Sequence, residues 1–359
     1  MTAATIARFV DRLSAGTAVP AALRQAYSRW RHLRYGSLIA RNVALKDRFR
    51  GRRCVIVGTG VSVDEIDFGQ LSNEYVFACN LLAKHKSFHR LKVAFYSATT
   101  PPEALYSPYY ERILLYAVYA PADGVPIRHD NADAVIADLF SQTAEFYSGA
   151  DEQTRRPHHF FSLLDQTCPD RSTVWFLDAS GHQFFRRAQL FRGRQVFYVL
   201  KGFDPATALF DLAKPISFAN GGLASSITVA IYMGFTEILL CGCGYTYQPR
   251  QEFHFYDAPV ISLEFSEREA LDWSARFAAS RGVTLHRMDR VSAGYRPMFV
   301  RHQPPADSDR AIEAYARSRG VRILNLVPEG FESPVFEAVR PADVWERRRG
   351  EPVILGRPV

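Results

Sequence analysis

The chain has 359 residues, of which 47% are hydrophobic and 23% are charged, as is typical of a folded globular protein. This length allows one large domain or two small ones around a sizeable core. The sequence has no apolar run of about 18 residues, and its first residues lack the apolar core of a secretory signal. We therefore expect a cytoplasmic protein, with peripheral attachment to the inner membrane as an alternative.

The net charge is +7, and only six of the 44 basic residues are lysine. These residues are dispersed and no nucleic-acid-binding motif is present, so we do not expect nucleic acid as a partner. Phosphate-bearing sugars or an anionic membrane face explain the charge equally well. The five cysteines are an odd number and lie mostly in apolar runs, which indicates buried, reduced thiols.

The first 50 residues form a basic, aromatic lead-in. One or two amphipathic helices are predicted between Leu23 and Ala44, where apolar residues lie among arginines. Packing of these helices against the main domain is the favoured interpretation, and docking on a membrane is the alternative.

From Arg53 onward, short β-rich runs alternate with helical stretches. This pattern predicts a doubly wound, mainly parallel α/β sheet of the Rossmann-like type in a domain spanning 51–340. The polar segment 121–172 is predicted to be a helical insertion that acts as a lid, and 341–359 a peripheral tail. The expected strands are 54–58, 75–80, 91–97, 112–120, 174–179, 195–200, 237–244 and 283–288, with another beginning at Ile323, and the expected later helices include 225–233 and 264–281.

A glycine-rich turn follows the first predicted strand and reads Gly58-Thr59-Gly60, with Ser62 two residues further on. Glycines at the carboxyl end of a first parallel strand allow the backbone to approach a phosphate or a ribose closely. The spacing matches neither the dinucleotide-binding fingerprint nor a Walker loop. A nucleotide site is one interpretation of this turn, and a tight strand-to-helix connection is the other.

Asn80 and Tyr96 lie at the ends of the next two predicted strands. Because the carboxyl ends of parallel strands meet at the edge where α/β sheets bind ligands, we expect both residues at the same site. Asn80 would contact the nucleotide and Tyr96 the substrate. The alternatives are a turn-capping role for Asn80 and a core position for Tyr96.

Two glycines precede the helix predicted at 225–233, in the stretch Asn220-Gly221-Gly222. Free amides at a helix N-terminus attract anions, so these three residues are candidates for binding a phosphate.

Polar and aromatic residues follow the strand predicted at 237–244. Tyrosine hydroxyls can donate hydrogen bonds to a departing phosphate, and a histidine can take the proton of an acceptor hydroxyl. We therefore expect Tyr245, Tyr247 and His254 to be catalytic, and Tyr256 and Asp257 to contact the substrate. In the alternative, this aromatic stretch only covers the sheet edge.

These motifs resemble those of the bacterial lipooligosaccharide sialyltransferases. The wider superfamily includes flagellin glycosylation factors and 6-hydroxymethylpterin diphosphokinase-like proteins. The resemblance covers about 51–100, 217–257 and 320–340. It rests on residues 58–63, Ile66-Asp67, Leu71, Cys79-Asn80, the block from Asn220 to Tyr245, and Ile323-Leu324-Asn325 with Pro328.

The resemblance implies a cytidine monophosphate moiety held by Gly58, Gly60, Ser62 and Asn80, with Gly221 and Gly222 close to its phosphate or to the donor sugar. It also implies that Tyr245 or Tyr247 stabilises the leaving phosphate. The role of His254 as base comes from its chemistry alone. The expected function is a metal-independent glycosyltransferase that moves a sugar, such as a CMP-activated acidic sugar, to a hydroxyl of a surface glycan.

Two alternatives remain. A diphosphokinase-like phosphotransferase would use the same scaffold with ATP and magnesium. A non-catalytic binder of nucleotide sugars is favoured by Thr59 and Val61, which stand where the family has asparagine and proline. An oligomer is compatible with the sequence, which does not indicate its size.

The sequence gives no indication of a metal site or another cofactor. The acidic string Asp307-Ser308-Asp309 resembles a metal-binding motif of glycosyltransferases, but its place at the start of a predicted helix favours capping of the free amides. His158-His159 has no partner at ligand spacing, and Cys241 and Cys243 are too close together for a zinc knuckle.

Overall fold

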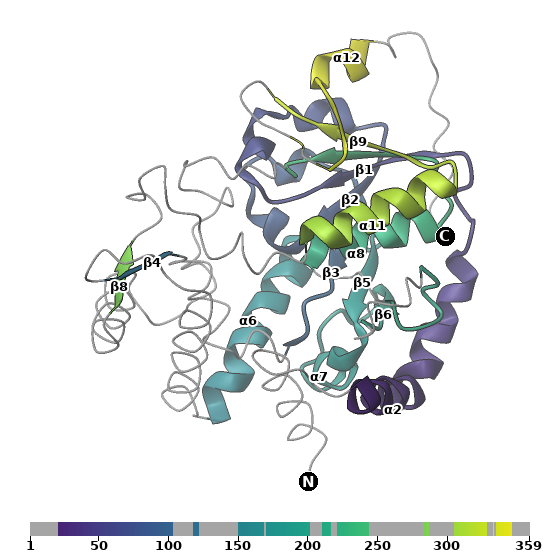
Figure 1. Ribbon diagram of the computed structural model, residues 1–359. Coiled ribbons are helices and arrows are strands. Elements are labelled where there is room, and N and C mark those ends of the chain that lie inside the picture. Colours follow the sequence, from purple (N-terminus) through teal and green to yellow (C-terminus); the bar gives the residue numbers. More distant parts are fainter. Residues whose placement is uncertain are drawn as a thin grey trace.

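The centre of the molecule is an eight-stranded sheet with the order β10-β9-β7-β1-β2-β3-β5-β6, in which every neighbouring pair is parallel (Figure 1). Its strands are β1 (Arg53–Val57), β2 (Tyr75–Cys79), β3 (Val93–Ala98), β5 (Val174–Asp178), β6 (Gln195–Val199), β7 (Glu237–Cys241), β9 (Arg322–Leu326) and β10 (Glu337–Val339). The computed structural model describes residues 21–102, 118–121, 150–168, 170–201, 210–216, 221–243, 283–286, 305–328, 333 and 335–346. The predicted α/β class with a parallel, Rossmann-like sheet is confirmed.

Two predicted strands do not belong to this sheet. β4 (Val118–Pro121) and β8 (Val283–His286) pair with each other, antiparallel, in a separate two-stranded sheet. The prediction that 112–120 and 283–288 extend the parallel sheet is therefore wrong. A short apolar run indicates a strand, but it does not specify the partner strand.

Helices cover both faces of the main sheet, because its central strands send alternate side chains into two cores. Ile56 and Phe77 face α8 (Gly221–Tyr232) and α11 (Pro305–Ser318). On the other face, Val55 belongs to the core beneath α6 (Ala150–Thr167), α7 (His182–Arg187) and α12 (Pro341–Glu346). Short 3-10 helices complete the layers: η1 (Arg41–Leu45), η2 (Val61–Glu65), η3 (Phe68–Leu71), η4 (Asn80–Lys84), η5 (Phe88–Arg90) and η6 (Ala179–Gly181).

The predicted N-terminal helix is α2 (Ala21–Ala40), which continues into η1. The guanidinium of Arg31 donates to the backbone oxygen of Lys201 at 2.6 Å and lies 3.9 Å from Asp178 Oδ1. The side-chain amide of Asn42 donates to the backbone oxygens of Tyr198 and Leu212. The helix therefore packs against the β6 edge of the sheet. None of the described helices is long and apolar enough to cross a bilayer.

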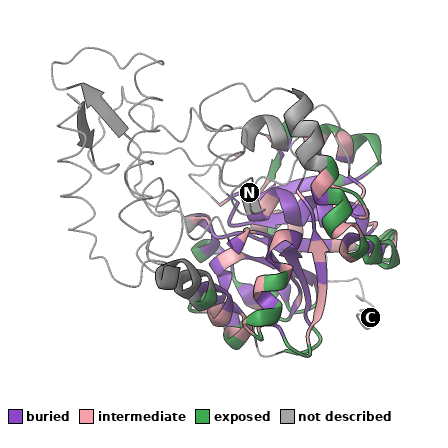
Figure 2. Cartoon of the chain, turned by 90° about the horizontal axis from the view of Figure 1, so that it is seen from below, coloured by how far each residue is buried: buried purple, intermediate pink, exposed green. Residues whose placement is uncertain are grey.

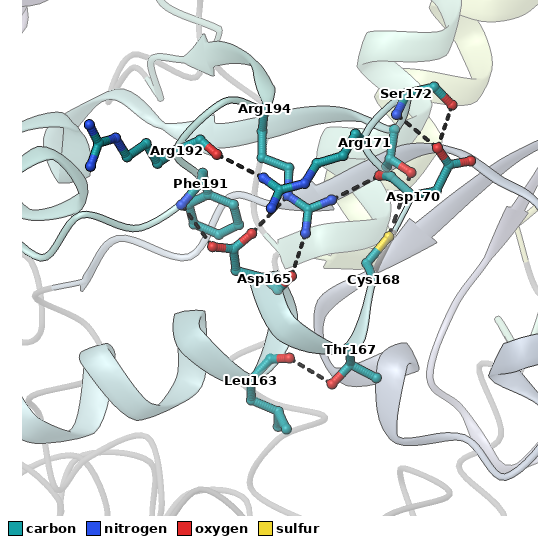
Figure 3. A network of polar contacts seen from close by, with 11 residues as sticks. Leu163, Asp165, Thr167, Cys168, Asp170, Arg171, Ser172, Phe191, Arg192 and Arg194 are labelled. Atoms are coloured by element: carbon teal, nitrogen blue, oxygen red, sulfur yellow. Dashed lines mark hydrogen bonds and ion pairs between the residues drawn. The ribbon is translucent and has the colours of Figure 1, made fainter.

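α6 lies in the segment predicted to be a lid, but one side of the helix packs into a core. Phe160 and Phe161 are buried there. Its C-terminal end is fixed by Arg194, whose Nε donates to Asp165 Oδ1 at 2.8 Å and whose NH1 donates to the backbone oxygen of Asp170 at 2.8 Å (Figure 3). This helix is thus a layer of the domain. The segments 103–117, 122–149 and 264–281 lie outside the described residues, and the domain boundaries and the lid stay predictions.

A row of alternating charges crosses the amino ends of five neighbouring strands. Arg53 at the start of β1 pairs with Glu74 beside β2 and, at 3.5 Å, with Glu237 of β7. Arg322 of β9 continues the row, 3.7 Å from Glu237 and 3.7 Å from Glu337 of β10. Arg53 and Glu74 are almost fully buried, whereas the Arg322–Glu337 end is exposed.

The buried ring of His85 is expected to make the free energy of unfolding depend on pH. It packs on Phe68 and lies 3.2 Å from Asp64 Oδ1. Burial lowers the pKa of His85 from its ordinary value of 6.5 and outweighs the opposite effect of Asp64. The unfolded chain then binds the proton more readily, so we expect stability to fall as the pH drops through 6.5. Urea unfolding between pH 5 and 8 should show a smaller pH effect in His85→Gln. An equal pH effect in both proteins would contradict this prediction.

Candidate functional site

The connectivity of the sheet places a switch point between β1 and β7. From β1 the chain adds strands on one side as far as β6, and then returns to β7 on the other side of β1. In open α/β sheets, ligands bind at the carboxyl ends of the two strands that flank such a point. Gly58 follows β1 and Gly242 follows β7, so these glycines mark the position of the expected crevice.

The glycine-rich turn is closely joined to the end of β7. The amide of Gly58 donates to the backbone oxygen of Cys241 at 2.7 Å, and that of Gly60 to the backbone oxygen of Gly242 at 2.8 Å. A Cβ atom at Gly58 would lie 2.7 Å from the Gly242 oxygen. These two amides are therefore engaged within the sheet, and the glycines allow the two strand ends to approach closely.

Thr59 and Ser62 flank this junction and are both buried. Ser62 lies in the first turn of η2, directly beyond the glycines. The polar side chains of the turn thus remain at the carboxyl edge of the sheet, next to β1.

Asn80, directly after β2, adopts an uncommon conformation. Its φ is +45°, in the left-handed region that few non-glycine residues occupy. The hydroxyl of Tyr96 donates to its backbone oxygen at 2.7 Å. Tyr96 itself is fully buried and stacks on Trp175 with ring centroids 4.4 Å apart. Tyr96 therefore supports Asn80 from within the core.

The side chain of Asn80 lies against the first turn of α8. A Cβ atom at Gly222 would be 2.7 Å from Asn80 Nδ2, so only glycine leaves room for the amide. Asn80 Oδ1 is buried and accepts no hydrogen bond from the described residues. Unpaired buried acceptors are costly, and strained backbone is concentrated at functional sites. Both features favour a ligand contact at Asn80.

Small polar side chains attach α8 to the carboxyl ends of β2 and β3. Thr99 Oγ1 donates to Ser225 Oγ at 2.9 Å, and Cys79 Sγ lies 3.1 Å from Ser226 Oγ. Ser226 also donates to the backbone oxygen of Gly222 at 2.7 Å. The first turn of α8, whose amides favour negative charge, is thereby held beside Asn80.

Asn325 of β9 lies on the other side of the switch point and was not predicted as a site residue. Its Nδ2 donates to the backbone oxygen of Cys243 at 3.2 Å and to Ser333 Oγ at 3.1 Å, while its Oδ1 is buried without a hydrogen-bond partner in the described structure. The sequence contains a feature that could indicate this residue: Asn325 is the single amide in the apolar run of a buried strand.

The thiols near this edge are not suited to nucleophilic chemistry. Burial is the main cause that raises the pKa of Cys79 to about 12 and that of Cys243 well above its usual range, so both stay protonated at neutral pH. Within the described ranges, no three histidine, cysteine or acidic residues are grouped as metal ligands. α11 begins at Pro305, so Asp307-Ser308-Asp309 lies inside its first turns, where Asp309 is buried.

The structure thus brings Asn80 and Gly222 into contact and places the Gly58–Ser62 turn on the neighbouring strand β1. Six predicted site residues lie outside the described part of the chain and stay predictions: Asn220, Tyr245, Tyr247, His254, Tyr256 and Asp257.

No protein-family model matches the chain, and a search of curated proteins finds no match. Among solved structures, the chain is similar to the sialyltransferase CstII from Campylobacter jejuni, determined in complex with a substrate analogue, cytidine-5'-monophosphate. The two chains are 14% identical, the alignment covers 80% of this chain and 85% of that one, and the TM-score is 0.31.

Proposed function

We propose that the chain binds a nucleotide sugar at the carboxyl edge between β7 and β2 and transfers the sugar to a glycan hydroxyl without a metal ion. The observation that carries this proposal is Asn80, whose side-chain oxygen is unpaired and whose amide lies against the first turn of α8. The polar residues Thr59 and Ser62 of the turn after β1 lie at the same edge of the sheet, next to the switch point.

The described groups suit a nucleotide in two ways. An asparagine amide both donates and accepts, so Asn80 can bond to a ribose hydroxyl or to the edge of a base. The first amides of α8 favour a phosphate, which a nucleotide supplies at a short distance from its ribose. Asn80 and the first turn of α8 lie along one edge of the sheet, so one ligand can make both contacts.

The chemical step in this proposal relies on residues known from the sequence alone. His254 would take the proton of the acceptor hydroxyl as that oxygen attacks the sugar, and Tyr245 or Tyr247 would donate hydrogen bonds to the departing phosphate. The resemblance to sialyltransferase motifs supports a CMP-activated acidic sugar as the donor class.

A panel of nucleotides tests the binding step. We expect CMP to raise the melting temperature more than UDP, GDP, ADP or ATP, with the same shift in the absence of magnesium, because a ligand of the folded state stabilises it by mass action. A shift with ATP and magnesium alone would favour the phosphotransferase instead. No shift with any nucleotide would contradict the proposal.

A substitution at the first turn of α8 tests the location of the site. In Gly222→Ala the new methyl group meets the end of the Asn80 side chain, which can rotate away. We therefore expect a small change in melting temperature but at least tenfold weaker nucleotide binding by calorimetry, which is about 1.4 kcal/mol.

Gly36→Ala serves as the matched control. It makes the same change within α2, where the nearest side chain, that of His32, is 3.8 Å from the new Cβ. Unchanged nucleotide affinity in Gly222→Ala, with normal binding by Gly36→Ala, would place the site elsewhere.

A further inference from the structure

The outward side of α2 and η1 combines exposed apolar and basic side chains. We call the exposed residues of this stretch the α2 outer face; they are Arg29, His32, Leu33, Arg34, Ser37, Ala40, Arg41, Val43, Ala44 and Lys46. Leu33 is 84% exposed and Val43 is 60% exposed, and these are the large hydrophobic side chains that are exposed in the described part of the chain. In Figure 2 the exposed residues of the described chain are green and the buried ones purple.

The same stretch is entirely basic in its charges. No acidic residue occurs from Ala21 to Lys46, while the sequence there supplies five arginines and one lysine. Arg31 is buried and joins the helix to Asp178, so its charge is used within the fold. The other described basic residues of the stretch point to solvent, where their charges add up.

Aromatic rings border this surface. The guanidinium of Arg34 lies over the ring of Trp30 at 5.3 Å and near that of Tyr35 at 5.5 Å, and both rings are half-buried. Tryptophan and tyrosine are enriched where proteins meet the headgroup level of a bilayer, because one end of each ring system is apolar and the other polar.

The outer face is held in place by its inner side. Arg31 and Asn42 bond to the carboxyl end of β5 and to β6, and Ile39 and Leu45 are buried beneath the helix. The inner side of α2 therefore already packs against the sheet, and Leu33 and Val43 are not part of that packing.

We propose that the α2 outer face docks on an anionic phospholipid membrane. Leu33 and Val43 would enter the boundary of the acyl chains, and the arginines would meet lipid phosphates, which is the arrangement of amphipathic helices that lie in the interface. A nucleic acid would satisfy the arginines but would gain little from the two apolar side chains. Attachment to a membrane goes beyond the proposed function and does not depend on it.

Co-sedimentation of the full chain with vesicles tests the proposal. We expect binding to vesicles of phosphatidylglycerol and phosphatidylcholine in equal amounts, weakening with added salt, and little binding to phosphatidylcholine alone. The double variant Arg29→Glu/Arg34→Glu should bind at least tenfold more weakly, and Leu33→Ser about tenfold more weakly.

The control is Arg192→Glu/Arg319→Glu, which changes the net charge by the same amount at two exposed turns near the amino ends of β6 and β9. It should bind anionic vesicles as the unaltered chain does. An equal loss in the control, or undiminished binding in both α2 variants, would overturn the proposal.

Two other results would also overturn it: no binding of the unaltered chain to anionic vesicles, or binding to a short DNA duplex that the α2 variants abolish while vesicles do not bind. The nucleotide panel measures melting temperature and the vesicle assay measures membrane binding. A failure of membrane docking therefore does not contradict the proposed function, and a failure of nucleotide binding does not contradict membrane docking.

Discussion

Gly242→Ala is expected to lower the free energy of unfolding by about 2 to 5 kcal/mol. Its φ of +62° is left-handed, which costs a residue with a Cβ about 1 to 2 kcal/mol. The new Cβ would also lie 2.7 Å from Val63 Cβ and 3.0 Å from the Gly58 oxygen, and such overpacking adds about 1 to 3 kcal/mol. Urea unfolding of the two proteins measures the difference.

Gly320→Ala is the control for this substitution. Gly320 has a similar φ of +70°, but nothing lies within 4 Å of the position of its Cβ. It should show the backbone cost alone, and the excess loss in Gly242→Ala then measures how tightly β1 and β7 are joined. Equal losses in the two variants would show that the close contact at the switch point is unimportant for stability.

Glu74→Ala is expected to destabilise the fold by about 3 kcal/mol. Glu74 pairs with Arg53 through two hydrogen bonds, and both side chains are almost fully buried. Removing one partner of a buried pair leaves the other charge without compensation, which typically costs about 3 to 5 kcal/mol. The lower end applies because Glu237 still lies 3.5 Å from Arg53. Thermal and urea unfolding would measure the loss.

The exposed end of the same charge row provides the control. Arg322 and Glu337 are both more than half exposed, so Glu337→Ala should cost less than about 1 kcal/mol. The double variant Arg53→Met/Glu74→Leu should recover most of the stability lost in Glu74→Ala, because no buried charge then remains unpaired. A double variant as unstable as the single one would contradict this explanation.

Most of the main sheet could be predicted from its strands. Runs such as 75–79 are apolar throughout and bounded by polar turns, because strands covered on both faces need no polar side chains. Partners were harder to infer. β4 resembles these runs in composition but pairs antiparallel with β8, and β10 has only three residues with mostly exposed side chains, too few to produce a pattern.

The sequence predicts which edge of the sheet holds the candidate residues, but not their contacts. The carboxyl edge follows from strand order, and Asn80 lies at the end of β2 as the sequence predicts. The amides of Gly58 and Gly60 donate hydrogen bonds to the end of β7, which lies far along the chain. The local sequence of the turn therefore cannot predict these bonds. The buried position of Tyr96 likewise depends on Trp175 of β5.

The central position of β1 also constrains the order in which the protein can assemble during synthesis. One edge of β1 pairs with β2, which leaves the ribosome shortly after it. The other edge pairs with β7, from Arg53 opposite Glu237 onward, and β7 is synthesised much later. Until β7 emerges, an apolar strand at the middle of the future sheet keeps an open edge, which can pair with other chains. Pairing over such a long separation is slow, so we expect the nascent chain to depend on chaperones during this interval.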